Sequence, residues 1–198
     1  MVIRELHEPE RRDVLAFFLA LGEDDRYRRF GRAMADAGVR RYIETLDWDA
    51  CVMLGAYDAG ARLIGVLELA EVANGACEIA VVVAATQRGR GIGKALMDRA
   101  LLKAKVHGCD SVVLLCQVDN APMRRLALSA GLTSTTEDGE VEGSLDLPHA
   151  ALVDVTEDVT REAIGNATYA SLLVTRTLAE LFENALRATA RPTHQPSG

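Results

Sequence analysis

Three glycines alternate with arginine and isoleucine in the stretch RGRGIG, residues 88–93, and a run with helical periodicity follows at once. A glycine-rich turn that opens a helix presents unpaired backbone N–H groups at the positive end of the helix dipole, and this arrangement binds anions. Glycine also lets the backbone approach a phosphate without an intervening Cβ. The stretch therefore predicts an anion site, to which Arg88, Arg90 and Lys94 add positive charge.

The spacing of these glycines excludes two common nucleotide loops. The phosphate loop of NTPases needs a glycine where Arg88 stands and a serine or threonine where Ala95 stands. The dinucleotide fingerprint GxGxxG needs a third glycine where Lys94 or Leu96 stands. What remains is the pattern R-x-x-G-x-G, formed by Arg88, Gly89, Arg90, Gly91, Ile92 and Gly93.

This pattern resembles the acetyl-CoA loop of the GNAT family of N-acetyltransferases, and the resemblance covers roughly residues 2–147. It implies that residues 88–94 hold the pyrophosphate of acetyl-CoA. It also implies that the backbone of Val81 and Val83, in the run EIAVVV, meets the pantetheine arm, and that Asn120, in NAPMRRLALSAG, faces the cofactor.

Within that family, EIAVVV, NAPMRRLALSAG and FFLALGEDDRYRRF resemble the acetyltransferase domain of bacterial protein-lysine acetyltransferases. Those proteins carry an acidic residue at the place of Glu78. Glu78 is our candidate general base, because a carboxylate on a largely buried strand is suited to proton abstraction. A backbone N–H at Val81 or Val83 would polarise the thioester carbonyl. Ala127 stands where many relatives have a tyrosine acid, which leaves an unassisted thiolate, Ser129 or a water for that role.

The elements that would position these residues follow the order of an α/β fold. We expect a GNAT fold, a mixed central β-sheet flanked by helices, with a C-terminal helical extension. The expected strands cover 2–6, 50–58, 61–72, 76–84, 111–118, 132–137 and 141–147, and the expected helices cover 7–22, 24–34, 37–47, 93–108 and 120–131.

Pro148 and His149 mark a boundary between an acetyltransferase domain, 1–148, and an extension, 149–190. In the extension we expect a further strand at 150–155 and an amphipathic helix at 169–188. The apolar stripe of that helix must be covered, either by its own domain or by a second copy in a homodimer. Residues 191–198 are expected to be a disordered tail.

Composition narrows the cellular context. The net charge is -7 over 198 residues, which argues against general nucleic-acid binding. The four cysteines form no CxxC pair, so we expect no metal site, small buried thiols and a reducing cytoplasm. The N-terminus lacks the apolar core of a signal peptide, and no apolar run is long enough to span a membrane. The basic run Arg26, Arg28, Arg29 and Arg32 is interpreted as a solvated helix face.

The sequence therefore predicts an acetyl-CoA-dependent N-acetyltransferase that modifies a primary amine, with a protein lysine as the preferred acceptor. Acidic residues near the predicted substrate-side loops favour a cationic amine: Glu71, Asp138, Glu140 and Glu142. Two alternatives stay open. One is an acetyltransferase of small amines, and the other is a non-catalytic acyl-CoA sensor.

Overall fold

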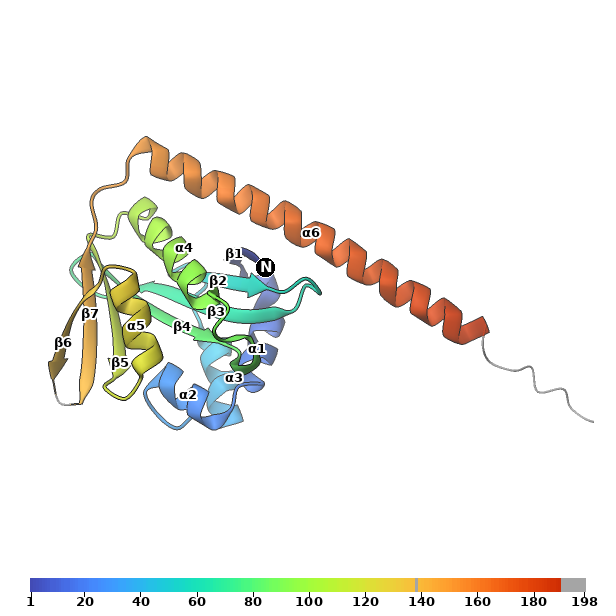
Figure 1. The fold of residues 1–198 in the computed structure, drawn as a ribbon, viewed down its shortest axis with the longest axis horizontal. Helices are drawn as coiled ribbons and strands as arrows, with labels where there is room; N and C mark the ends of the chain where they lie inside the picture. The colour runs from blue at the N-terminus through green and yellow to red at the C-terminus, as the bar shows by residue number, and fades with distance from the viewer. Residues whose placement is uncertain (138, 190–198) are drawn as a thin grey trace, which may run out of the picture.

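A computed structural model describes residues 1–137 and 139–189 (Figure 1). Within these residues, seven strands form one sheet in the order β1-β2-β3-β4-β5-β7-β6. This confirms the predicted mixed sheet flanked by helices. The strands are β1 (Val2–Leu6), β2 (Cys51–Tyr57), β3 (Leu63–Glu71), β4 (Ala76–Val83), β5 (Ser111–Gln117), β6 (Thr133–Glu137) and β7 (Glu140–Asp146).

One pairing in this sheet is parallel and short. Strands β1 to β4 run antiparallel to one another, and so do β5, β7 and β6. In the described chain, β4 pairs with β5 in parallel over Ala76, Cys77 and Glu78 and over no later residue of β4. The two strands therefore diverge after Glu78, and the rest of β4 has a free edge on that side.

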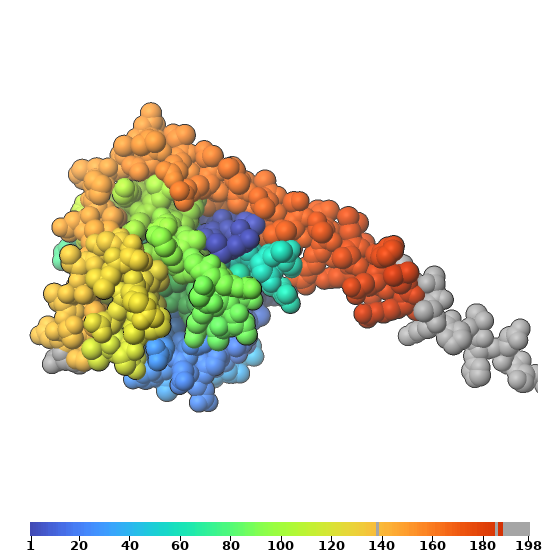
Figure 2. All heavy atoms as spheres, viewed as in Figure 1, coloured from blue at the N-terminus to red at the C-terminus, as the bar shows by residue number. Residues whose placement is uncertain are grey.

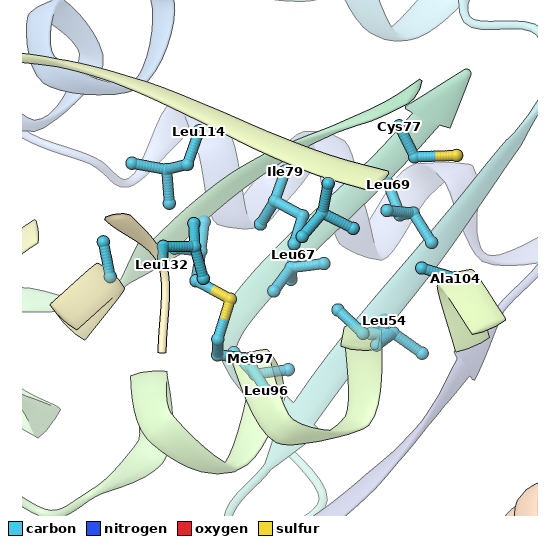
Figure 3. Packing of buried hydrophobic residues seen from close by; sticks show 14 of the residues in the cluster. Leu54, Leu67, Leu69, Cys77, Ile79, Leu96, Met97, Ala104, Leu114 and Leu132 are labelled. Carbon is cyan, nitrogen blue, oxygen red and sulfur yellow. The ribbon is translucent and has the colours of Figure 1, made fainter. Parts of the chain in front are cut away.

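Helices cover both faces of the sheet. Helices α4 (Ile92–Val106) and α5 (Ala121–Ser129) pack on one face, over a core in which Leu67, Ile79 and Leu96 are almost fully buried (Figure 3). Helices α1 (Arg11–Leu19), α2 (Glu23–Phe30) and α3 (Asp36–Thr45) lie on the other face. Two short 3₁₀ turns, Glu8–Glu10 and Ala85–Gln87, precede α1 and α4. The helix expected from residue 7 therefore begins as a 3₁₀ turn at Glu8, next to Pro9.

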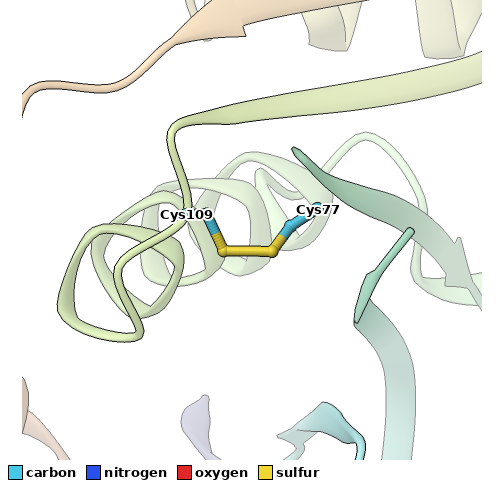
Figure 4. Close-up of a disulfide and its surroundings, with 2 residues drawn as sticks. All are labelled: Cys77 and Cys109. Atoms are coloured by element: carbon cyan, nitrogen blue, oxygen red, sulfur yellow. A yellow bond between two sulfur atoms is a disulfide. The ribbon is translucent and has the colours of Figure 1, made fainter. Parts of the chain in front are cut away.

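A disulfide joins Cys77, the second residue of β4, to Cys109, which lies between α4 and β5 (Figure 4). The Cα atoms of the two residues are 6.1 Å apart. The interpretation of all four cysteines as isolated buried thiols is therefore wrong for this pair, because residues 32 apart in sequence meet at the paired end of β4 and β5. Cys51 and Cys116 are free.

The strand expected at 150–155 is wrong, because this run belongs to α6 (Leu152–Thr189). A short apolar run does not distinguish a strand from a helix by periodicity alone. The charged residues that follow decide the outcome, since Asp158 and Glu162 share one helix face and meet Arg99 of α4. Residues 191–198, the expected tail, lie outside the described residues.

Ion pairs hold α6 on the domain. Lys103 of α4, which also lies 2.6 Å from Glu5 of β1, is buried and lies 3.3 Å from Asp158. The half-buried Lys105 lies 3.8 Å from Asp154. Further along α6, the Tyr169 ring stacks on the Arg4 guanidinium at 4.1 Å. The last turns of α6 project beyond the rest of the described chain (Figures 1 and 2).

Candidate functional site

The free edge of β4 forms one wall of the site. Because the N–H of Ala84 donates to Ile64 of the β3 side, the alternation of an antiparallel strand turns the N–H and C=O groups of Val81 and Val83 toward the open side. The Val83 carbonyl there accepts a hydrogen bond from Nε of Arg88 at 3.1 Å. The other backbone groups on this edge lie beyond the pairing with β5 and can hydrogen-bond an extended, amide-containing chain.

The glycine loop leads into the second wall. Gly89 and Gly91 have φ angles of 75° and 77°, in the left-handed region that favours glycine. Gly91 is the N-terminal cap of α4 and makes no side-chain capping bond, so the first N–H groups of the helix remain available to an anion. Gly93 lies in the first turn, where a Cβ would come 3.5 Å from Leu126 of α5.

These walls enclose a groove of about 490 Å³. Helix α2 closes one side of it with Asp25, Arg28 and Arg29, and α5 closes the other with Met123 and Leu126. The residues predicted from the sequence that line the groove are Val81, Val83, Arg88, Gly89, Gly91, Ile92, Gly93 and Asn120. Glu78, Arg90 and Lys94 are not among its lining residues.

The three basic side chains of the loop are each engaged with a neighbour. Arg88 reaches across to Asp25 of α2, 2.5 Å away. Arg90 donates to the side chain of Gln87 at 2.7 Å, and Lys94 pairs with Asp98, one turn along α4, at 3.2 Å. Arg88 is the one of the three that lines the groove, and Arg90 and Lys94 are not among its lining residues.

Asn120 both caps α5 and lines the groove. Its side-chain oxygen accepts a hydrogen bond from the N–H of Met123 at 3.3 Å and so caps the helix. The residue is 5% exposed and lines the groove. The same side chain therefore begins α5 and faces the place predicted for the cofactor.

Glu78 is the last residue of β4 that pairs with β5. Its neighbours Cys77 and Ile79 belong to the core under α4, so the alternation of the strand turns Glu78 toward the opposite face of the sheet. Glu78 is half-buried there, and lies across from Ala70 of β3 and Val113 of β5. It stands three positions before Val81, at the point where the two strands part.

A second carboxylate, which sequence reasoning missed, lies on the same sheet face. Glu68 of β3 is opposite Ala80, so it is a diagonal neighbour of Glu78 at about 7 Å between Cβ atoms. Glu68 accepts hydrogen bonds from both Arg29 and Tyr42. Burial is the main cause that raises the pKa of Tyr42, which therefore stays a neutral donor.

Two arginines of the basic run are buried, so its interpretation as a solvated face is wrong for them. Arg29 has an 8% exposed side chain, lines the groove and lies over the Phe30 ring. Arg26 pairs with Asp36 at 2.7 Å and donates to the Leu19 and Leu21 carbonyls. No local sequence pattern predicts these contacts, because the partner residues come from other elements.

Trp48 and the two free cysteines lie in structural surroundings. Trp48 packs against the core beneath α1 and α3. Burial, and then the Glu68 charge, raises the pKa of the Cys51 thiol to about 12, and burial also raises the pKa of Cys116. Neither thiol is poised to act as a nucleophile.

Two further searches concern the part of the chain that the structure describes. Within residues 1–137 and 139–189, no group of three or more His, Cys, Asp or Glu side chains is arranged to hold a metal ion. No helix in those ranges is long and apolar enough to cross a membrane.

Comparisons with solved structures show the same fold. The GNAT domain of S. lividans PAT matches with a TM-score of 0.64 and 22% identity, over 73% of this chain and 89% of that one. A ribosomal-protein-alanine N-acetyltransferase from Brucella melitensis matches with a TM-score of 0.61 and 18% identity, over 74% of this chain and 100% of that one. A spermidine N-acetyltransferase from Vibrio cholerae, in complex with CoA and spermine, matches with a TM-score of 0.59 and 18% identity, over 73% of this chain and 94% of that one.

No protein of curated function matches the chain. Residues 16–132 match the family model described as Acetyltransferase (GNAT) family. This segment runs from α1 to the residue before β6 and includes the free edge of β4, the glycine loop and the Asn120 cap. The chain therefore belongs to the GNAT family of acetyltransferases, enzymes that use acetyl-CoA as co-substrate.

Proposed function

We propose that this chain transfers the acetyl group of acetyl-CoA directly to a lysine side chain of another protein, with Glu78 as general base. The observation that carries the proposal is the parting of β4 and β5 after Glu78. It places a free strand edge beside the uncapped start of α4 on one side and a carboxylate on the other. Residues 88–93 would hold the pyrophosphate, and the Val81 and Val83 backbone would hold the pantetheine amides.

The chemistry needs a neutral amine, since a free lysine amine is mostly protonated at pH 7. Glu78 would remove that proton, directly or through one water. The water is included because the groove does not reach the Glu78 side chain. The amine nitrogen then bonds to the thioester carbonyl carbon while the carbon–sulfur bond breaks. A backbone N–H of Val81 or Val83 would stabilise the carbonyl oxygen as it becomes negative.

A water is the best remaining candidate to protonate the leaving thiolate. Ala127, at the position of the tyrosine of many relatives, is 4% exposed and packs in the core. The Ser129 hydroxyl is already engaged, since it donates a hydrogen bond to the Leu126 carbonyl at 2.8 Å. Direct transfer is favoured over an acyl-cysteine route because burial keeps both free thiols protonated.

The sheet face beside Glu78 supports a protein acceptor. Alternation along β5, β7 and β6 places Leu115, Glu142 and Thr135 in one row of this face, and Gln117, Glu140 and Glu137 in the next. Asp146 shares the face, and all four carboxylate residues are exposed. An open, acidic floor suits a cationic polypeptide better than it suits a small enclosed amine.

Two of the acidic residues weighed from the sequence do not contribute to this floor. Glu71 lies opposite Cys77 and so belongs to the other face of the sheet. Asp138 lies outside the described residues.

The cytoplasmic location stays a prediction.

A thiol-release assay with acetyl-CoA, run against lysine-bearing proteins, spermidine and single amino acids, tests the proposal. Turnover should be highest with lysine in a basic peptide. Glu78→Gln should lower kcat by about 10²- to 10⁴-fold, the usual contribution of general-base catalysis, while calorimetry shows unchanged acetyl-CoA affinity. Unchanged turnover would exclude Glu78 as the base.

Gly91→Glu is the matched control for the cofactor site, because it places a carboxylate at the start of α4. It should abolish acetyl-CoA binding in calorimetry, and retained affinity would refute the assigned loop. The two alternatives give different results. An acyl-CoA sensor binds acetyl-CoA but modifies no acceptor, and a small-amine enzyme prefers spermidine or an amino acid over every peptide.

A further inference from the structure

Helix α6 carries an exposed apolar stripe from Leu152 to Leu181. The large residues of this stripe are between 59% and 82% exposed: Leu152, Val159, Val174, Leu178 and Leu181. They recur at helical intervals, so they lie on one side of the helix. Asp158, Gly165 and Tyr169, which contact the domain, lie on the opposite side. The domain therefore leaves the stripe uncovered.

We propose that a second copy of this chain covers the stripe, so that two α6 helices pack against each other in a homodimer. The pattern of the stripe matches itself. Its middle holds the small exposed residues Ala163, Ala167 and Ala170, and larger side chains lie on both sides of them. Small residues let two helix backbones approach closely, and the large residues then pack with each other at both ends.

Charge favours a like partner, and the area of the stripe corresponds to a small interface. From Ala163 to Leu181, the stripe positions carry no charge in the described part of α6, so two copies meet there without repulsion. The stripe from Leu152 to Leu181 is about 44 Å long and about 10 Å wide. That is on the order of 440 Å² per copy, within the roughly 300–600 Å² of the largest monomer patches. Two copies would bury on the order of 900 Å², close to the roughly 1,000 Å² expected of a biological interface.

A membrane surface is the less suitable occupant. Helices that lie in an anionic membrane interface carry lysine and arginine on the polar face. The exposed polar side of α6 instead carries balanced pairs, Arg161 with Glu157, Arg176 with Glu180 and Arg187 with Glu183. The whole chain has a net charge of -7, and acidic lipids repel a chain of net negative charge.

Light scattering after size-exclusion chromatography of the full chain tests the pairing. The expected mass is twice the 21.4 kDa of one chain. Val174→Asp combined with Leu181→Asp should reduce it to a single chain. Ala179→Asp, which adds one negative charge on the other side of the helix, should leave the dimer intact. Acetyl-CoA affinity, measured by calorimetry, should be unchanged in all three proteins, which separates this proposal from the proposed activity.

Cysteine cross-linking locates the interface. Ala167→Cys, in the middle of the stripe, should give a covalent dimer on mild oxidation, because the centre of the stripe meets itself in either orientation of the pair. Glu183→Cys, on the side away from the stripe, should not. A single-chain mass for the wild type, a dimer that survives Val174→Asp with Leu181→Asp, or co-sedimentation of the chain with phosphatidylserine vesicles would each overturn the proposal.

Discussion

Reduction of the bridge between Cys77 and Cys109 is expected to lower the free energy of unfolding by about 3.7 kcal/mol. The bridge closes a loop of 32 residues, and the chain-entropy relation gives this value for a loop of that length at 25 °C. For a chain of this size, such a loss corresponds to a fall in Tm of about 7–15 °C. The loop contains α4 and the glycine turn, so both elements are constrained by the bridge.

The assay is thermal unfolding of the wild type with and without dithiothreitol, followed by circular dichroism. Cys109→Ser is the matched control, because it removes the bridge and leaves Cys77 in place. Its Tm should be low and should not respond to the reductant. A wild-type Tm that falls by less than about 2 °C, or a Cys109→Ser protein that loses as much as the wild type, would refute the reasoning.

Two further predictions concern buried contacts. Glu68→Gln should lower the free energy of unfolding by about 3 kcal/mol in urea, because it leaves the Arg29 guanidinium buried and unpaired. Replacement of both residues, Arg29→Met with Glu68→Gln, should restore part of that stability, and an additive loss would contradict the pairing. Gly165→Ala should cost about 1–3 kcal/mol and expose α6 to proteases, because its Cβ would lie 2.6 Å from the Ile3 carbonyl oxygen. Ala179→Ser, at an exposed position on the side of α6 away from the stripe, is its control. An unchanged proteolysis rate for Gly165→Ala would argue against this close approach.

Local signals were enough to predict the elements around the groove. Strand β4 has the β-branched run that ends in Val83, the glycines set the turn, and Asn120 and Gly131 bracket α5. Each of these signals acts through a residue's own backbone preferences or its near neighbours. These signals can therefore be identified in the sequence without any knowledge of the tertiary structure.

The features that the sequence did not predict depend on residues far apart in the chain. Glu68 meets Arg29 across 39 positions, and Arg99 meets Asp158 across 59. The same holds for the disulfide, whose cysteines have no diagnostic spacing. Burial of a charged residue follows from the partner that it finds, so the solvated-face interpretation of Arg26 and Arg29 was wrong for a tertiary reason.

The chain has three lysines among its 22 lysines and arginines, and all three lie on α4. Each one forms an ion pair: Lys94 with Asp98, Lys103 with Glu5 and Asp158, and Lys105 with Asp154. Each amine is thus held at a carboxylate, and the Lys103 side chain is also buried, with 7% of its surface exposed. Under the proposed lysine-acetylating function, the chain's own lysines would therefore compete little with the acceptor.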